Sequence, residues 1–180
     1  MVNQYNQILR EFVQGQFGAA IEMLRILIEA CPQDIWDNRQ EGTPFWHIAY
    51  HTIFYLDFYL GNSKEQMEQH DGPAFHFPAA QWFAGEYSHP PYRVETPETP
   101  FSHEQIMDYL SDVRQKAKKI LSVLNIENLA EKTAFYWLDQ TKGDTLLYNL
   151  RHVHHHVRQL YAILKRKMNN VPCWQVRIPL

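Results

Sequence analysis

Residues 45–60 constrain the fold of this chain more than any other segment, because they are apolar on nearly every face of a helix. Thr43 can cap the start of such a helix, Pro44 suits its first position, and Gly61 marks its end. A helix without a polar face belongs in the interior of a bundle. We therefore expect a helix over residues 44–60 that is surrounded by other helices.

Three further segments show the 3.6-residue apolar period of amphipathic helices. The first covers about residues 5–30. The second covers residues 102–124 and opens with Ser102 and Gln105, which can form a capping box. The third begins at about Asp144, which can cap it. With the buried helix, these segments predict an all-α protein of the four-helix-bundle class.

The segments between these helices differ in length and composition. Residues 62–100 form a long connection between the second and third helices that is rich in aromatic residues and proline, so it cannot be one continuous helix. Residues 33–42 are a polar connection, and residues 125–143 are irregular. We expect residues 169–180 to form an extended arm that packs on the bundle or on a second chain. Residues 1–180 are expected to form a single domain.

Composition and charge exclude several classes of protein. The net charge of -3 and the absence of a large basic patch argue against nucleic-acid binding. The sequence has no stretch of about 20 uninterrupted apolar residues, so it predicts no membrane span. The N-terminal residues do not resemble a signal peptide, so Cys31 and Cys173 are expected to be reduced thiols in a cytoplasmic protein.

The histidines of residues 151–156 are the strongest chemical signal in the sequence. His152 and His156 are four residues apart, so they share one face of the last helix and could bind one metal ion. A third ligand has to come from another element. His51, in the buried helix, is the best candidate, and three histidines would leave coordination positions open for chemistry.

This spacing leaves alternatives open. His47 and His51 are also four residues apart, so either of them, or both, could complete the site. Asp57 could serve as a ligand or accept a hydrogen bond from a ligand histidine, although it lies on a different face from His51. The histidine run could also be a solvated helix flank without a metal.

Two motifs are similar to those of a known superfamily. An aromatic residue stands five positions before His51, and residues 152–159 read His-x3-His-x2-Gln. In these motifs the chain resembles the DinB-like superfamily of helical-bundle, metal-dependent enzymes, which includes thiol-dependent S-transferases. The resemblance implies a three-histidine site for a divalent transition metal at His51, His152 and His156. Zinc or nickel is expected first, with iron as a further option.

The activity implied by the resemblance is that of a hydrolase or a thiol transferase acting on a small molecule, with a low-molecular-weight thiol as a candidate co-substrate. We expect Tyr50, Tyr55 and Tyr148 to line the pocket. No carboxylate has a fixed short spacing from the histidines, although acidic residues of the long connection could approach, namely Glu86, Glu95 and Glu98. The alternatives are a non-catalytic metal-binding or stress-response module and a metal-free helical dimerisation domain. The resemblance also implies a homodimer.

Overall fold

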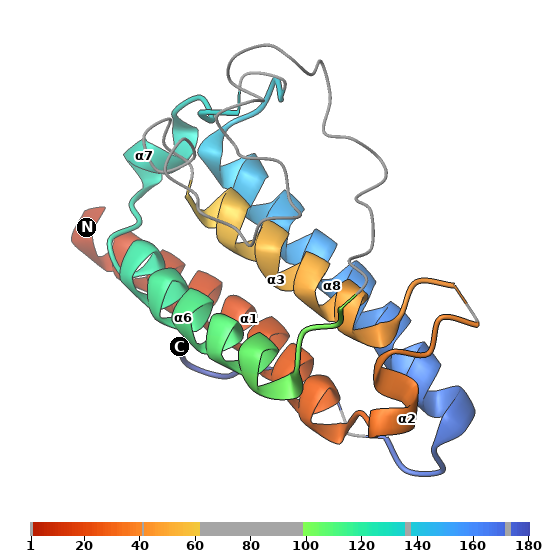
Figure 1. Ribbon diagram of the computed structural model, residues 1–180. Coiled ribbons are helices and arrows are strands. Elements are labelled where there is room, and N and C mark those ends of the chain that lie inside the picture. The colour runs from red at the N-terminus through yellow and green to blue at the C-terminus, as the bar shows by residue number, and fades with distance from the viewer. Residues whose placement is uncertain (1, 41, 62–98, 136–137, 172–173) are drawn as a thin grey trace, which may run out of the picture.

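The computed structural model describes residues 2–40, 42–61, 99–135, 138–171 and 174–180. Their helices, in chain order, are α1 (Val2–Ala30), α2 (Gln33–Trp36), α3 (Phe45–Leu60), α6 (His103–Leu121), α7 (Ile126–Ala130) and α8 (Lys142–Lys167). The four long helices pack side by side (Figure 1), with α3 against α6 and α8, and α1 against the same two helices. The pairs α1 and α3, and α6 and α8, therefore lie diagonally across the bundle. The expected all-α four-helix bundle is confirmed.

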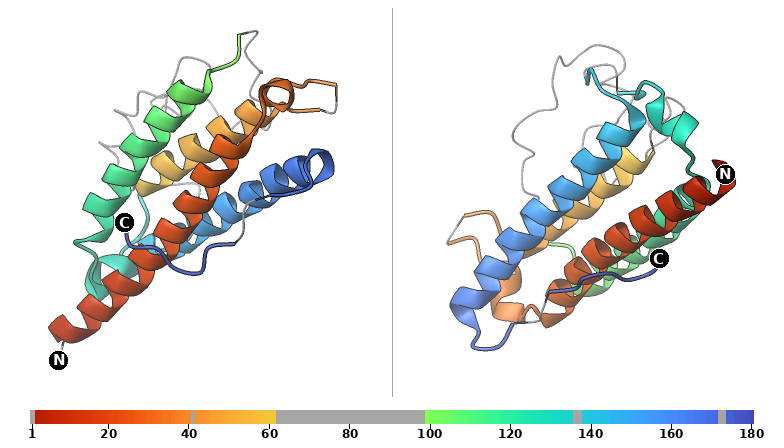
Figure 2. Two further views of the ribbon diagram at one scale, coloured as in Figure 1. Left: turned by 90° about the horizontal axis from the view of Figure 1, so that it is seen from below. Right: turned by 180° about the vertical axis from the view of Figure 1, so that it is seen from behind.

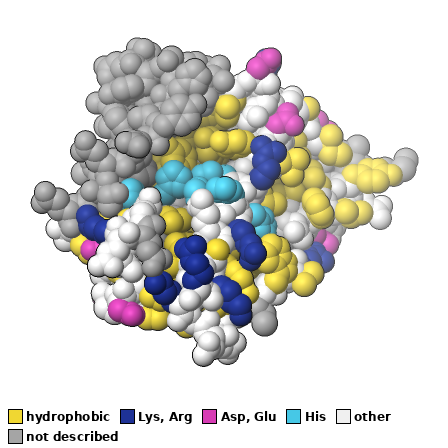
Figure 3. Space-filling model, turned by 90° about the vertical axis from the view of Figure 1, so that its right-hand side faces the viewer, with side chains coloured by type: hydrophobic (Ala, Val, Ile, Leu, Met, Phe, Trp, Pro, Cys, Tyr) yellow, Lys and Arg dark blue, Asp and Glu magenta, His cyan; other side chains and the backbone are white. Residues whose placement is uncertain are grey.

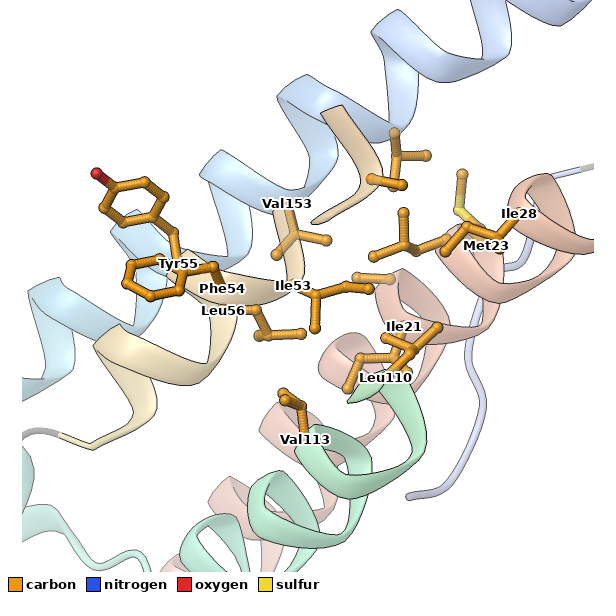
Figure 4. Packing of buried hydrophobic residues seen from close by; sticks show 14 of the residues in the cluster. Ile21, Met23, Ile28, Ile53, Phe54, Tyr55, Leu56, Leu110, Val113 and Val153 are labelled. Carbon is orange, nitrogen blue, oxygen red and sulfur yellow. The ribbon is translucent and has the colours of Figure 1, made fainter. Parts of the chain in front are cut away.

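Helix α3 supplies the centre of the core, as its composition predicts. Fourteen of its 16 residues are buried. Figure 4 shows Ile53 and Leu56 of α3 lying between Val153 of α8 and Val113 of α6, with Ile21 of α1 closing the same cluster. Burying side chains of this size stabilises the fold by about 1.5–3 kcal/mol each. The interior position of α3 holds its polar side chains at fixed places between its neighbours.

The starts of α3 and α8 differ from the predicted ones. Pro44 occupies the N-cap of α3 in an extended conformation, and no side chain caps this end, so the prediction that Thr43 caps it is wrong. Thr141, three residues before the predicted cap, is the N-cap of α8. The Thr141 hydroxyl accepts from the Asp144 backbone N–H, while the Asp144 carboxylate accepts from the Thr141 backbone N–H. This reciprocal pair satisfies two helix-end donors at once, which a single cap at Asp144 could not do.

The predicted capping box of Ser102 and Gln105 is present at the start of α6.

Two connections contain short helices. In residues 33–42, predicted as a polar connection, Pro32 precedes the short helix α2, which buries its apolar residues Ile35 and Trp36. Helix α7 lies within the irregular residues 125–143. Most of the long connection, residues 62–98, is outside the described part of the chain, as is Cys173.

The C-terminal residues 174–180 run along the outside of α1 (Figure 2), which fulfils the prediction of an arm packed on the bundle. The Ile178 N–H donates to the Gly15 carbonyl oxygen at 3.2 Å. A Cβ atom added at Gly18 would lie 1.8 Å from the Ile178 carbonyl oxygen. The two glycines of α1 therefore permit the close approach of this arm. None of the described helices combines the length and apolar character needed to cross a membrane.

Candidate metal centre

The structure brings three histidines from two helices together. One nitrogen atom from each of His51, His152 and His156 can be chosen so that all three lie within 4.8 Å of one another. The ring of His51 is 5.3 Å from that of His152 and 4.7 Å from that of His156, between ring centroids. All three side chains are partly exposed. Such a group can hold one divalent ion with positions left for other ligands, and metal binding at these residues stays a prediction.

Two local features produce this arrangement. The four-residue spacing places His152 and His156 on one face of α8, where their Nε2 atoms are 3.0 Å apart. Helix α3 packs against α8 and presents His51 to the same point. Figure 3 shows histidine side chains gathered on one face of the molecule beside hydrophobic side chains. The two packed helices therefore fix the relative positions of the three rings.

Burial keeps these rings neutral at physiological pH. Burial, with repulsion from His156 and His47, lowers the pKa of His51 to about 3. Burial and the neighbouring histidines lower the pKa of His152 to about 2. Burial also lowers the pKa of His156, although its hydrogen bond to Gln159 acts in the opposite direction. A neutral imidazole has the lone pair that a metal ligand needs.

Aromatic side chains extend from the histidines along α3 and α8. The ring of Tyr55 lies 4.7 Å from that of His51 and 5.4 Å from that of His152. Tyr59 is 5.8 Å from Tyr55 and 5.1 Å from Tyr148. Tyr55 and Tyr148 thus lie near the histidines, and their role in lining a pocket stays a prediction. Sequence reasoning missed Tyr59, which the four-residue spacing from Tyr55 on α3 could have revealed.

Tyr50 does not belong to this group, and its predicted place in the pocket is wrong. Its ring is 1% exposed and lies 5.8 Å from that of Tyr109 on α6. Asp57 also faces α6, where its carboxylate accepts from the Tyr109 hydroxyl at 3.0 Å and pairs with Lys116. Tyr50 and Asp57 thus both lie on the side of α3 that faces α6, away from α8. Asp57 therefore serves the packing of α3 on α6.

The other described histidines have different surroundings. His47 is buried, stacks on Trp46 at 5.3 Å and is not one of the three clustered histidines, so the structure favours His51 over it. His154 stacks on Trp174 of the C-terminal arm at 5.5 Å. His155 is exposed. The candidate acidic residues of the long connection lie outside the described residues, namely Glu86, Glu95 and Glu98.

The donor set suits a divalent transition metal. Three imidazole nitrogens are common ligands of zinc, nickel and iron, and among the described residues no Asp, Glu or Cys joins the group. The buried Nδ1 of His152 has no hydrogen-bond partner among the described residues, which leaves this ring held through its Nε2 side. Three neutral ligands leave the double charge of such an ion uncompensated. The site therefore favours an anionic additional ligand.

These features define a helical bundle with a candidate metal centre between two of its long helices. The family model of the DinB superfamily matches residues 16–160, a range that contains all three histidines. The chain therefore belongs to the DinB superfamily. Comparison with curated proteins and with solved structures found no match.

Proposed function

We propose that this protein is a divalent-metal-dependent enzyme whose site is formed by His51, His152 and His156. The observation that carries the proposal is the convergence of three neutral imidazoles from α3 and α8. Zinc or nickel is the expected metal, with iron as a further option, because imidazole ligands suit all three. A divalent ion at this position supplies a Lewis acid that lowers the pKa of a water or thiol ligand.

The surrounding residues favour a thiol over water as the nucleophile. Among the described residues no carboxylate joins the histidine group to accept a proton. A thiol has an ordinary pKa of about 8.5 and loses its proton more readily than free water, so it needs no base from the described residues. We accordingly propose transfer of a low-molecular-weight thiol to a small electrophile. Hydrolysis is the second candidate.

We expect the aromatic residues beside the histidines to contact the substrate. Tyr55, Tyr59 and Tyr148 form a continuous row of rings that starts at His51. The guanidinium of Arg151 lies over the Tyr148 ring, 5.6 Å from its centroid. This row combines apolar contact area with a positive charge at its far end. We expect it to bind a small molecule that has an apolar body and an electron-rich or anionic group.

The proposal is tested with the protein loaded with zinc, nickel or iron(II) and assayed against a panel of thiols and electrophiles. We expect metal-dependent loss of free thiol that the His51→Ala variant does not catalyse. The matched control is His47→Ala, since His47 lies on the same helix but outside the group. Turnover on esters or amides without a thiol would favour the hydrolase.

The main alternative is a non-catalytic metal-binding module. In that case chelation would lower the melting temperature of the protein, while neither the thiol panel nor the ester and amide panel would show turnover. Equal thiol consumption by the wild type and the His51→Ala variant would contradict the proposed site.

A further inference from the structure

Two side-chain amides flank the histidines of α8 at equal spacing. Asn149 lies three residues before His152, and Gln159 lies three residues after His156. On a helix, positions three and four apart are neighbours, so these four residues form one stripe along α8. The amide groups therefore lie at the two ends of the histidine pair, one on each side.

Gln159 already holds one of the rings. The His156 Nδ1–H donates to the Gln159 Oε1 at 2.7 Å. This hydrogen bond fixes the hydrogen of the neutral His156 ring on Nδ1, so its Nε2 has the lone pair. The Nε2 atom of His152 lies 3.0 Å from the Nε2 atom of His156, so it must supply the hydrogen between the two rings. With its hydrogen on Nε2, His152 has a lone pair on Nδ1.

At the other end of the stripe, an amide oxygen and a ring nitrogen three residues apart along α8 both lack a partner among the described residues. The Asn149 Oδ1 and the His152 Nδ1 are both buried, and neither has a hydrogen-bond partner among the described residues. The Asn149 Nδ2–H₂ group donates to the Leu56 carbonyl oxygen of α3 at 3.0 Å. This bond anchors the side chain on the helix that carries His51. Two acceptors cannot form a hydrogen bond with each other, which explains why the Asn149 oxygen and the His152 nitrogen both lack a partner among the described residues.

Ligation of a metal through the Nε2 of His152 changes which nitrogen of this ring carries the hydrogen. The ring then needs its lone pair on Nε2, so its hydrogen must move to Nδ1. A buried N–H without an acceptor is costly, and the Asn149 Oδ1, one helical turn away on the same stripe, is a buried acceptor that lacks a donor among the described residues. We propose that Asn149 and Gln159 are positioning residues that accept the Nδ1–H of His152 and His156 and so aim both Nε2 atoms at one ion. This inference rests on metal binding by the three histidines.

The test is the dissociation constant for zinc, measured by competition with a chromophoric chelator. Partners of metal-bound histidines typically change metal affinity by about 10- to 100-fold. We expect a loss of this size in Asn149→Leu and in Gln159→Met, which remove the acceptors at nearly constant volume. Asn149→Asp and Gln159→Glu keep an acceptor oxygen, so they should bind zinc at least as tightly as the wild type.

The Asp variant separates positioning from a structural role. Asn149→Asp loses the donor to the Leu56 carbonyl but keeps the acceptor. If Asn149 only joined the helices, Asn149→Asp would bind zinc as weakly as Asn149→Leu, and this result would overturn its assignment. Thr145→Val is the matched control, because Thr145 is another buried, hydrogen-bonded residue of α8, and it should leave the zinc affinity unchanged.

Nitrogen NMR of the imidazole rings gives an independent readout. In the zinc-free protein, we expect the hydrogen of His152 on Nε2, and zinc should move it to Nδ1. Wild-type zinc affinity in Gln159→Met would overturn the assignment of Gln159, and the same result in Asn149→Leu would overturn that of Asn149. Absence of zinc binding in the wild type would instead contradict the proposed metal site itself.

Discussion

At the scale of single residues, burial decides which histidines can serve as ligands. His51, His152 and His156 lie together and have lowered pKa values, so all three are neutral at pH 7. His155, on the same helix, is exposed and is not one of the clustered histidines. The same burial means that protonation of the three rings opposes folding.

This gives the first prediction, on stability against pH in the chelator-treated protein. Above pH 6.5 the rings of His51 and His152 are neutral in the folded and unfolded chains, so their contribution is fully present. Below pH 6.5 the unfolded chain takes up protons that the folded chain excludes until pH 2–3, so the free energy of unfolding falls. At pH 5 the loss should be on the order of 2 kcal/mol per ring. Urea unfolding at pH 7 and pH 5 measures it.

Two variants test whether these rings cause the loss. His152→Gln removes one imidazole whose pKa is lowered to about 2 and should reduce the difference in stability between pH 7 and pH 5. His51→Gln removes the other ring whose pKa is lowered to about 3 and should reduce the difference in the same way. Equal stability of the wild type at the two pH values would show that the rings are not held neutral by the fold.

The residues of the site could be predicted only where local geometry decides. The spacing of His152 and His156 is enough to place them on one face of α8. His47 and His51 have the same spacing, and the packing of α3 against α8 selects His51. The prediction that Tyr50 lines the pocket fails for the same reason. Its environment depends on which neighbour lies across α3, and a single sequence does not contain that information.

At the scale of elements, a strongly apolar composition predicts that a helix exists more reliably than it predicts where the helix begins. The apolar run of α3 identified it, and its end at Gly61 agrees with the sequence. At α3, Pro44 takes the N-cap and no side chain caps the helix, so the Thr43 cap predicted from residue type does not form. At α8, Thr141 and Asp144 compete for the cap, and the number of hydrogen bonds that each can form decides between them. At α8 the reciprocal bonds of Thr141 and Asp144 favour the earlier start.

The C-terminal arm gives a prediction at this scale. Gly18→Ala should destabilise the full chain, because the new methyl group would lie 1.8 Å from the Ile178 carbonyl oxygen. In a chain that ends at residue 174 the same change should stabilise, by about 0.5–1 kcal/mol, because alanine favours a helix more than glycine does. The free energy of unfolding of the four proteins is the measurement. The same sign of effect in both backgrounds would mean that the arm does not press on α1.

At the scale of the whole molecule, the diagonal arrangement of the bundle sets where chemistry can occur. Helices α3 and α8 are neighbours, so His51 from one and the histidine pair from the other meet between them. Helix α6 lies on the other side of α3, where its Tyr109 and Lys116 bind the carboxylate of Asp57. One buried helix thus has a structural polar contact on one side and the candidate metal centre on the other. The homodimer stays a prediction that light scattering of the purified protein would test.

The measurement that tests the central claim most directly is elemental analysis of the untagged protein beside its His152→Ala variant. We predict about one transition-metal equivalent per chain in the wild type, as expected for a single three-histidine site, and almost none in the variant. His154→Ala is the control, because His154 lies on the same helix but stacks on Trp174, and it should keep the metal. A wild type that holds no metal after incubation with zinc and nickel, or a variant that holds as much as the wild type, would contradict the account.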